Sequence, residues 1–424
     1  PMSMPQTVSP LAERIRRANQ QAMDILCSAS PVWVDVCPAL EVLPGMRSNT
    51  ILHAGPPIAW EEMCGPQQMG VLHAVIHEGL AHDEAGAMSL LRAGGIVLAP
   101  CHEYDAVGGM AGITSASSPM AVVLNRHSGN YGYSQLFQGP AGGLQSRDHY
   151  HREARRQWHW LATVLGPALK AAVRHLGGLE VKPLIARALE MGDECHNRNS
   201  AGSGLLLKAL APALFATSDS SQRLRESLDY LTWADQFSLC ISMASAKATA
   251  DAARNIPFST VVTTMARNGV DFGIKVSGLG EQWFTAPANR VDGLYFSSEY
   301  SDADAVADMG DSAIMEVVGL GGHAQAAAPA LQQFVGGSFA RAVGLTQEMG
   351  QITLGVMPEY RIPNIDFAGA PLGTDMRLVV QTGITPVIDT AIAHHKGGVI
   401  GAGQTRAPLA CFTAALRAFH QQYA

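Results

Sequence analysis

The sequence lacks the features that mark several large classes of protein. Its seven cysteines are odd in number and widely spaced without a CxxC pair, so we expect neither a disulfide framework nor a zinc knuckle. Only 15% of the residues are charged, and the lysines and arginines are scattered instead of forming a basic stripe. No apolar run reaches the length needed to cross a bilayer. We therefore expect neither nucleic acid nor a membrane as a partner.

Signatures of targeting and of familiar chemistry are also missing. Residues 1–17 lack the charged-then-apolar pattern of a secretion signal, which predicts a cytoplasmic protein. No GxSxG elbow, Ser-His-Asp order or nucleotide-binding glycine fingerprint supports covalent acyl-enzyme chemistry or nucleotide binding. Asp193 and His196 have a possible ligand spacing, but no second histidine follows at a metal-site interval. We therefore expect no metal ion and no cofactor.

The composition predicts a large protein of the mixed α+β class. The chain has 424 residues, of which 47% are hydrophobic, enough to bury a large core in two or three domains. Strand-like and helix-like segments alternate in residues 51–148 and again in 256–424, whereas 149–255 has helical spacing. We predict an N-terminal helix and cover in 1–50, and two α/β domains with glycine-rich loops, joined by a helical domain in 149–255.

Periodicity and turn residues predict the individual elements. Helices are expected over 10–27, 67–93, 158–175, 224–252 and 409–420. Extended segments are expected over 31–43, 50–53, 95–100, 259–264 and 312–318.

A long loop with several glycines, residues 101–119, is the first candidate binding segment. It carries an imidazole, flexible backbone N–H groups and hydroxyls, from His102, Gly108, Gly109, Gly112, Thr114 and Ser115. Such a nest can hold a carboxylate, a phosphate or a carbamoyl oxygen. The alternative is a surface loop in which the glycines only permit turning, although long structureless loops are uncommon in compact domains.

The sequence MGDECHNRNS, residues 191–200, is the densest polar cluster in an apolar neighbourhood. A helix there would place Asp193, His196 and Asn199 on one face and would pair Glu194 with Arg198. A carboxylate beside His196 would hold the imidazole in one tautomer and raise its basicity, which suits proton transfer. The alternative is a solvated polar turn of helix.

The C-terminal half offers two arginines as clamps for an anion. Arg267 follows a strand-like segment and Arg406 precedes a helix start, and a guanidinium binds carboxylate or phosphate through two parallel hydrogen bonds. Asn268, Glu281 and Asp311 are further binding candidates beside glycine-containing turns. The alternatives are that Arg267 only stabilises a strand end and that Asp311 only caps a turn. The inventory favours a non-covalent reaction on a small anion.

Six long strings of the sequence resemble the YlbE/YahG family, in the same order along the chain. They are LHAGPPIAWEEMCGP, PCHEYDAVGGMAGITSASSPM, MGDECHNRN, TTMARNGVDFGIKVSGLGEQWFTAP, DMGDSAI and GAGQTRAPLACF. One branch of this family is the AllG-type subunit of oxamate carbamoyltransferase, which is associated with FdrA-type and YlbF-type subunits. The resemblance implies two α+β domains with a helical domain.

Resemblance and residue inventory together predict a carbamoyltransferase subunit in a homo- or hetero-oligomer with FdrA-like and YlbF-like subunits. The reaction implied is oxamate plus carbamoyl phosphate to oxalurate plus phosphate, or its reverse. The two arginines would bind carboxylate and phosphate, and the glycine-rich loop would stabilise the oxyanion. The catalytic candidates for proton transfer are His102, Asp193, Glu194 and His196. The alternatives are a non-catalytic organising subunit of an FdrA-type complex and a phosphate-independent ureide or amide hydrolase.

Overall fold

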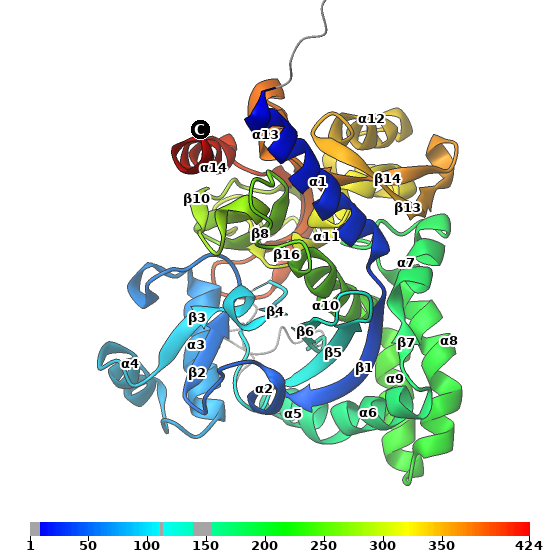
Figure 1. Ribbon diagram of the computed structural model, residues 1–424. Helices are drawn as coiled ribbons and strands as arrows, with labels where there is room; N and C mark the ends of the chain where they lie inside the picture. The colour runs from blue at the N-terminus through cyan, green and yellow to red at the C-terminus, as the bar shows by residue number, and fades with distance from the viewer. Residues whose placement is uncertain (1–8, 111–112, 139–153) are drawn as a thin grey trace, which may run out of the picture.

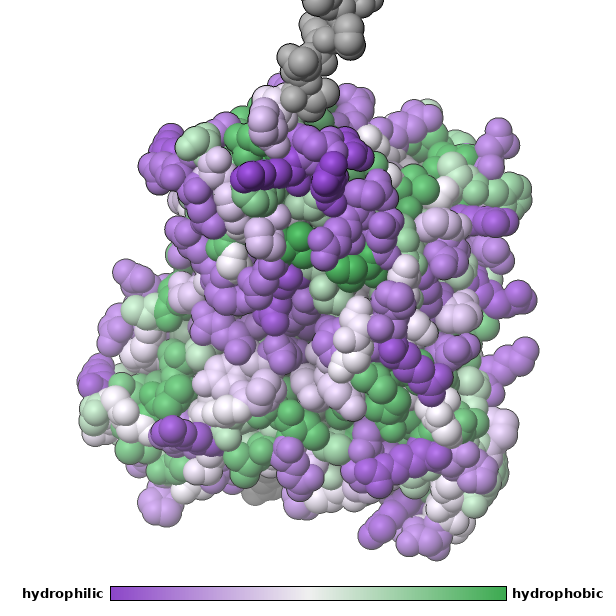
Figure 2. Space-filling view, viewed as in Figure 1, coloured by the Kyte–Doolittle hydropathy of each residue, from purple (hydrophilic) through white to green (hydrophobic). Residues whose placement is uncertain are grey.

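The protein has the mixed α+β fold that the sequence predicts. A computed structural model describes residues 9–110, 113–138 and 154–424. Helices and several separate sheets alternate along the chain (Figure 1). The face seen in Figure 2 is largely hydrophilic around α1 (Pro10–Ser28), and apolar residues gather in the lower half. The division into domains at the boundaries given above stays a prediction.

The first sheet has five strands in the order β4-β6-β5-β1-β7. All neighbouring strands are antiparallel except β4 and β6. Their bounds are β1 (Pro31–Pro38), β4 (Ala106–Val107), β5 (Pro119–Asn125), β6 (Tyr131–Gln135) and β7 (Leu179–Glu180). A separate parallel pair lies beside this sheet and is connected by two helices. It comprises β2 (Thr50–His53), α3 (Gly65–His77), α4 (Glu84–Arg92) and β3 (Val97–Pro100), and the short helix α2 (Ala39–Val42) precedes it.

Helix α10 (Phe237–Asp251) packs closely against β5 and β6. A Cβ atom on Gly132 of β6 would lie 2.2 Å from the carbonyl oxygen of Ala244, so glycine is required for this approach. Every residue of α10 except Leu239 is buried, including its two charged residues, Lys247 and Asp251. Burying a charge is costly unless the charge is paired, and Lys247 and Asp251 form such a pair inside the core.

Helices before α10 pack around the first sheet and α10, and α6 packs against both β1 and α8. They are α5 (Arg155–Trp160), a π-helical turn (Leu161–Leu165), α6 (Gly166–His175), α7 (Val181–Glu190), α8 (Ser200–Thr217) and α9 (Ser221–Trp233). Among the described residues, α8 alone has the length and composition of a membrane span, and 33% of that window is buried. It packs against α6, α7 and α9, so this composition is weak evidence for a membrane.

The C-terminal part contains three further sheets. The four-stranded sheet has the order β10-β9-β8-β12, the three-stranded sheet has the order β11-β16-β15, and β13 pairs with β14. The strands are β8 (Val262–Asn268), β9 (Asp271–Val276), β10 (Phe284–Pro287), β11 (Asp292–Tyr295), β12 (Met309–Gly310), β13 (Thr353–Ile362), β14 (Ala368–Thr374), β15 (Val387–Ala393) and β16 (Val399–Arg406). The α-helices are α11 (Ile314–Val317), α12 (Phe339–Met349), α13 (Met376–Thr382) and α14 (Leu409–Tyr423).

Short 3-10 helices connect the longer elements. Their bounds are Trp60–Glu62, Cys101–Tyr104, Ser277–Leu279, Gly321–Ala327, Pro329–Val335 and Pro363–Ile365. Helix α1 lies on β13 and β14, as Figure 1 shows, and Asn19 binds Thr260 through two hydrogen bonds of 2.9 Å. One hydrophobic core runs from α1 through β1 and α10 to β8, β9 and α14. The N-terminal helix is thereby tied to the C-terminal part of the chain.

Several predicted elements are correct and others are wrong. The helices expected at 10–27 and 409–420 and the strand at 50–53 are confirmed. The predicted helix 67–93 is two helices, α3 and α4, and 224–252 is likewise two, α9 and α10, because turns interrupt each one. The extended segment 31–43 ends at Pro38. Residues 312–318, predicted as a strand, contain helix α11, since tertiary packing overrides the local preference of β-branched residues.

Candidate functional site

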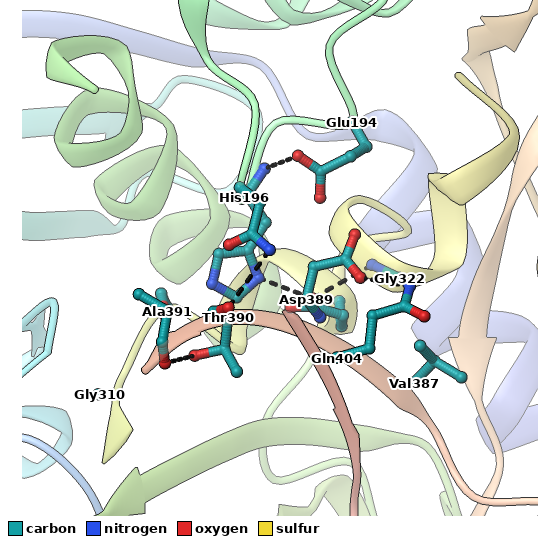
Figure 3. A network of polar contacts seen from close by, with 12 residues as sticks. Glu194, His196, Gly310, Gly322, Val387, Asp389, Thr390, Ala391 and Gln404 are labelled. Atoms are coloured by element: carbon teal, nitrogen blue, oxygen red, sulfur yellow. Dashed lines mark hydrogen bonds and ion pairs between the residues drawn. The ribbon is translucent and has the colours of Figure 1, made fainter. Parts of the chain in front are cut away.

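A buried polar network joins segments that are far apart in the sequence. We define it as Glu194, His196, Arg267, Asp308, Asp311, Glu316, Asp389 and Thr390, which are all between 0% and 4% exposed. Glu194 and His196 lie in the loop between α7 and α8, and Asp389 and Thr390 lie on β15 (Figure 3). Buried titratable groups are costly and are found preferentially at functional sites. The network is therefore the candidate site.

The imidazole of His196 is held by the carboxylate of Glu316. Its Nδ1 lies 2.7 Å from Glu316 Oε1, and the same oxygen accepts the backbone N–H groups of Asp389 at 3.0 Å and Gly322 at 3.2 Å. Because Glu316 Oε1 is an acceptor for three donors, Nδ1 of His196 carries the proton, and the lone pair is left on Nε2. This is the arrangement of a carboxylate that orients a histidine base.

Glu194 and Asp389 form a pair of hydrogen-bonded carboxyl groups next to His196. Glu194 Oε1 accepts the backbone N–H groups of His196 at 2.9 Å and Arg198 at 2.6 Å. Gln404 donates to Asp389 Oδ1 at 2.7 Å. Burial raises the pKa of Glu194 well above its usual range and that of Asp389 to about 6. The pair therefore holds a proton near neutral pH.

Arg267 connects β8, β12 and β15. Its Nε donates to Asp308 at 2.8 Å, Nη1 donates to the carbonyl of Gly310 at 2.6 Å, and Nη2 donates to Thr390 Oγ1 at 3.0 Å. Ser312 Oγ lies 3.4 Å from both Nη atoms. The guanidinium is thus neutralised by a buried carboxylate and surrounded by protein acceptors. In the free chain it does not offer an open fork to a substrate.

Asp311 occupies a cradle made by two glycine loops. Its two carboxylate oxygens accept the backbone N–H groups of Gly55 at 2.8 Å and Gly108 at 2.9 Å. A Cβ on Gly55 would lie 2.4 Å from the backbone of Arg267, so glycine is required there. Burial raises the pKa of Asp311 to about 7, against the lowering effect of these two N–H donors. The predicted anion nest thus holds a carboxylate of the protein itself.

His102 lies beside the Asp311 oxygen that accepts the N–H of Gly55. Its Nε2 is 3.6 Å from Asp311 Oδ1, and its Nδ1 is 2.9 Å from Nζ of Lys247. The ring is fully buried and meets Trp283 edge-on at a centroid distance of 5.9 Å. The candidate His102 therefore does lie beside the network.

The cluster at residues 191–200 is a loop and not the helix that we considered, so its members do not share one helical face. Asp193 Oδ2 accepts the N–H of Gly202 at 2.8 Å, which satisfies a free donor at the start of α8. Asn199 donates to the carbonyl of His196 at 2.7 Å, and the Arg198 side chain is 43% exposed. The carboxylate expected beside His196 is present, but it comes from Glu316, 120 residues further along the chain.

Three candidates from the glycine-rich loop contact other parts of the protein or solvent instead of the network. Thr114 pairs with Leu52 in an isolated bridge, and Ser115 Oγ donates to Glu78 at 2.6 Å. Gly109 is exposed directly after the buried Gly108. The remaining candidate, Gly112, lies outside the described residues.

The other C-terminal candidates form hydrogen bonds or ion pairs with neighbouring residues of the protein. Asn268 accepts the N–H groups of Val270 and Asp271 in the turn after β8, which is a capping role. Glu281 is 56% exposed and pairs with Lys275 at 3.0 Å. Arg406 pairs with Glu348 at 2.8 Å and is 40% exposed. Arg406 and Arg267 thus have separate partners, and the structure does not bring them together as two clamps on one anion.

Sequence reasoning missed several members of the network. Glu316 is the one charged residue in the run AIMEVV, and Lys247, which contacts His102 beside the network, is a lone cation among small residues in α10. A single charge inside an apolar segment is a recognisable signal, because such a residue must be paired or functional. Asp389 gives the same signal, as the one charged residue in the strand VIDTAIA, whereas Asp308 stands in a polar stretch.

One group of potential metal ligands occurs among residues 9–110, 113–138 and 154–424. Donor atoms of Asp304, His394 and His395 lie within 4.8 Å of one another, at the turn after β15. His394 Nδ1 accepts the N–H of Lys396 at 2.9 Å, so Nε2 of the neutral ring carries a proton and has no lone pair for a metal. We assign no metal to this group.

The fold and the network define the class of this protein, which is an α+β chain with a cluster of titratable side chains buried in its interior. Comparison with known proteins identifies its family. The family model described as oxamate carbamoyltransferase subunit AllG matches residues 96–312. The Escherichia coli (strain K12) protein named oxamate carbamoyltransferase subunit AllG is 44% identical over 409 residues, which are 95% of this chain and 97% of that protein. The chain therefore belongs to the AllG family, which confirms this part of the predicted resemblance.

Two further relatives have no assigned activity in their names. The uncharacterized protein YahG of Escherichia coli (strain K12) is 45% identical over 417 residues, covering 98% of this chain and 88% of that protein. The crystal structure of a conserved protein of unknown function from Enterococcus faecalis V583 has a TM-score of 0.95 and 44% identity. That match covers 98% of this chain and 100% of the other. The fold is therefore shared over nearly the whole length.

Proposed function

We propose that this chain is a subunit of a carbamoyltransferase for small ureido or amide acids, of the type oxamate plus carbamoyl phosphate to oxalurate plus phosphate. The name of the AllG relative supports the class of reaction. The observation that carries a catalytic role is the His196–Glu316 pair, in which Nδ1 is tethered and Nε2 makes no hydrogen bond to the described residues. FdrA-like and YlbF-like subunits are the proposed partners, as the family resemblance implies.

In this proposal His196 acts as the base. The amide nitrogen of oxamate attacks the carbamoyl carbon, a C–N bond forms, the C–O bond to phosphate breaks, and the nitrogen loses a proton to Nε2 of His196. The anionic Glu316 stabilises the imidazolium that results, as a carboxylate does for a catalytic histidine. The Glu194–Asp389 pair keeps a second proton within the network. Phosphate or solvent then takes the proton from His196.

The test uses the full chain assembled with its FdrA-like and YlbF-like partners. Oxalurate and phosphate are supplied, and carbamoyl phosphate is measured with the wild type, His196→Gln and Glu316→Gln. A matched control is His73→Gln, because His73 is also buried and lies 3.9 Å from a glutamate, Glu84, but in α3. We expect the two network variants to lose about 10²-fold or more in turnover and the control to be unchanged.

Three results would overturn parts of the proposal. No carbamoyl phosphate from the wild-type complex with oxalurate or related ureido acids rejects the transferase. Turnover that does not need phosphate identifies a hydrolase instead. Full turnover by His196→Gln rejects this residue as the base.

A second candidate is a non-catalytic subunit that organises the partner bearing the chemistry. The observation that favours it is the closure of the network, since the donors of Arg267 are used by Asp308, Gly310 and Thr390 and the residue is 0% exposed. Under this alternative, Arg267→Ala weakens assembly of the complex, which gel filtration with the partners measures. Under the enzyme proposal, by contrast, His196→Gln assembles normally and loses turnover, whereas an organising subunit keeps the turnover of the complex with this variant.

A further inference from the structure

Lys247 is a buried cation that contacts the imidazole of His102 and determines which ring nitrogen carries the proton. Its Nζ lies 2.9 Å from His102 Nδ1, 3.3 Å from the His102 carbonyl oxygen and 2.9 Å from Asp251 Oδ2. Lys247 is 1% exposed, and the His102 side chain is 0% exposed. An ammonium group and an imidazole are thus in direct contact in the protein interior.

The three partners of Lys247 fix the position of the proton on His102. A carbonyl and a carboxylate are acceptors only, so two of the ammonium protons point at the His102 carbonyl and at Asp251. The third proton points at His102 Nδ1, which must then present its lone pair. In a neutral imidazole with an unprotonated Nδ1, the proton is on Nε2.

The charges around His102 oppose a second proton on the ring. Burial and, after it, the nearby cations Lys247 of α10, Lys275 of β9 and Arg254 after α10 hold the pKa of His102 well below its usual range. The anion that faces Nε2 is Asp311, at 3.6 Å from Oδ1. Asp311 already accepts two backbone N–H groups, and its own pKa is raised to about 7 by burial.

We propose that Lys247 is a positioning residue, which locks His102 as a neutral imidazole with its proton on Nε2. His102 is then a fixed hydrogen-bond donor directed at Asp311 or at an oxygen atom of a ligand beside it. It has no lone pair on that side and does not act as a base there. The proposal divides the two histidines by role, because His196 presents a lone pair at Nε2 and His102 presents a proton.

The test is the tautomeric state of His102 in the full chain, read from long-range ¹H–¹⁵N correlations of histidine-labelled protein. The spectrum of His102→Gln assigns the signal by its loss. We expect the proton on Nε2 and no titration between about pH 5 and about pH 8, the range in which an ordinary histidine changes charge. His53 is an internal control with the opposite tautomer, because its Nδ1 donates to the carbonyl of Ala54 at 2.8 Å.

Variants show whether Lys247 is the cause. Lys247→Met leaves Asp251 unpaired, so Lys247→Met with Asp251→Asn is the better-folded comparison. We expect the Nδ1–H form of His102 to appear in either variant, while the signal of His53 stays unchanged. A proton on Nδ1 in the wild type, a ring that titrates in the stated range, or an unchanged tautomer in the double variant would each overturn the proposal. The result does not depend on carbamoyltransferase activity.

Discussion

Replacing Arg267 by Met distinguishes a structural arginine from a substrate clamp. The change keeps most of the side-chain volume and removes the guanidinium, which donates to Asp308, Gly310 and Thr390. Both Arg267 and Asp308 have side chains that are 0% exposed, and Asp308 Oδ1 has no other hydrogen-bond partner among the described residues. The variant therefore leaves a carboxylate in the protein interior without a counter-charge.

The expected loss of stability is large. Removing one partner of a buried ion pair costs about 3–5 kcal/mol, because the remaining charge is uncompensated. A guanidinium that bound only a substrate would have no partner in the protein, so its removal would leave no protein group unpaired. The free energy of unfolding would then fall by less than about 1 kcal/mol. The structural interpretation therefore predicts a loss of stability at least about three times as large as the substrate-clamp interpretation does. Replacing both residues, as Arg267→Met with Asp308→Asn, should recover part of the loss because no buried charge remains.

Urea unfolding followed by tryptophan fluorescence measures the free energy of unfolding of the wild type, the two single variants and the double variant. The interaction energy is obtained from the four values as a double-mutant cycle. A loss of less than about 1 kcal/mol for Arg267→Met would refute the structural reading and favour the clamp. A double variant as unstable as the sum of the single variants would show that Arg267 and Asp308 do not act as a pair.

Three further predictions concern other parts of the site. Glu316→Gln should lower the kcat of the assembled complex by about 10²-fold or more, because a neutral amide no longer stabilises an imidazolium, and an unchanged kcat would contradict this. The raised pKa of Asp311, about 7, means that the folded state binds an extra proton above the unfolded pKa of about 3.9. Stability should therefore fall as the pH rises from about 4 to about 7, and urea titrations of Asp311→Asn across this range should show a flatter profile. Asp193→Ala should cost about 1 kcal/mol in thermal unfolding, because the N–H of Gly202 loses its acceptor, and a variant of unchanged stability would rule out this capping role.

The sequence correctly predicted which segment holds part of the site, but it did not predict how the side chains of that segment are arranged. The cluster at 191–200 contains Glu194 and His196, which are both in the network. The helix considered there is wrong because Gly192 has a positive φ of 103° and the backbone turns through a loop before α8. Helical spacing therefore gave the wrong neighbours. The carboxylate that orients His196 had to come from elsewhere, and it is Glu316.

The predicted anion-binding loop shows a second limit of prediction from local sequence. Its glycines do supply a backbone donor, but the N–H of Gly108 binds Asp311, another candidate from a distant segment. Local sequence indicates that a loop can bind an anion, and it contains no information on whether the protein supplies that anion itself. Arg267 shows the same limit, because its guanidinium donates to Asp308, Gly310 and Thr390 of the protein.

The sequence alone determined the α+β class, the starts of the first and last helices, the family and several residues of the buried network. These depend on local periodicity, on residue chemistry and on long strings of identity, which are all read along the chain. Tertiary structure alone decided that Glu316 pairs with His196, that the carboxyl groups of Asp389 and Glu194 meet, and that Lys247 faces His102. These pairs join residues 120, 195 and 145 positions apart, and no local pattern fixes which distant segments meet in a common core.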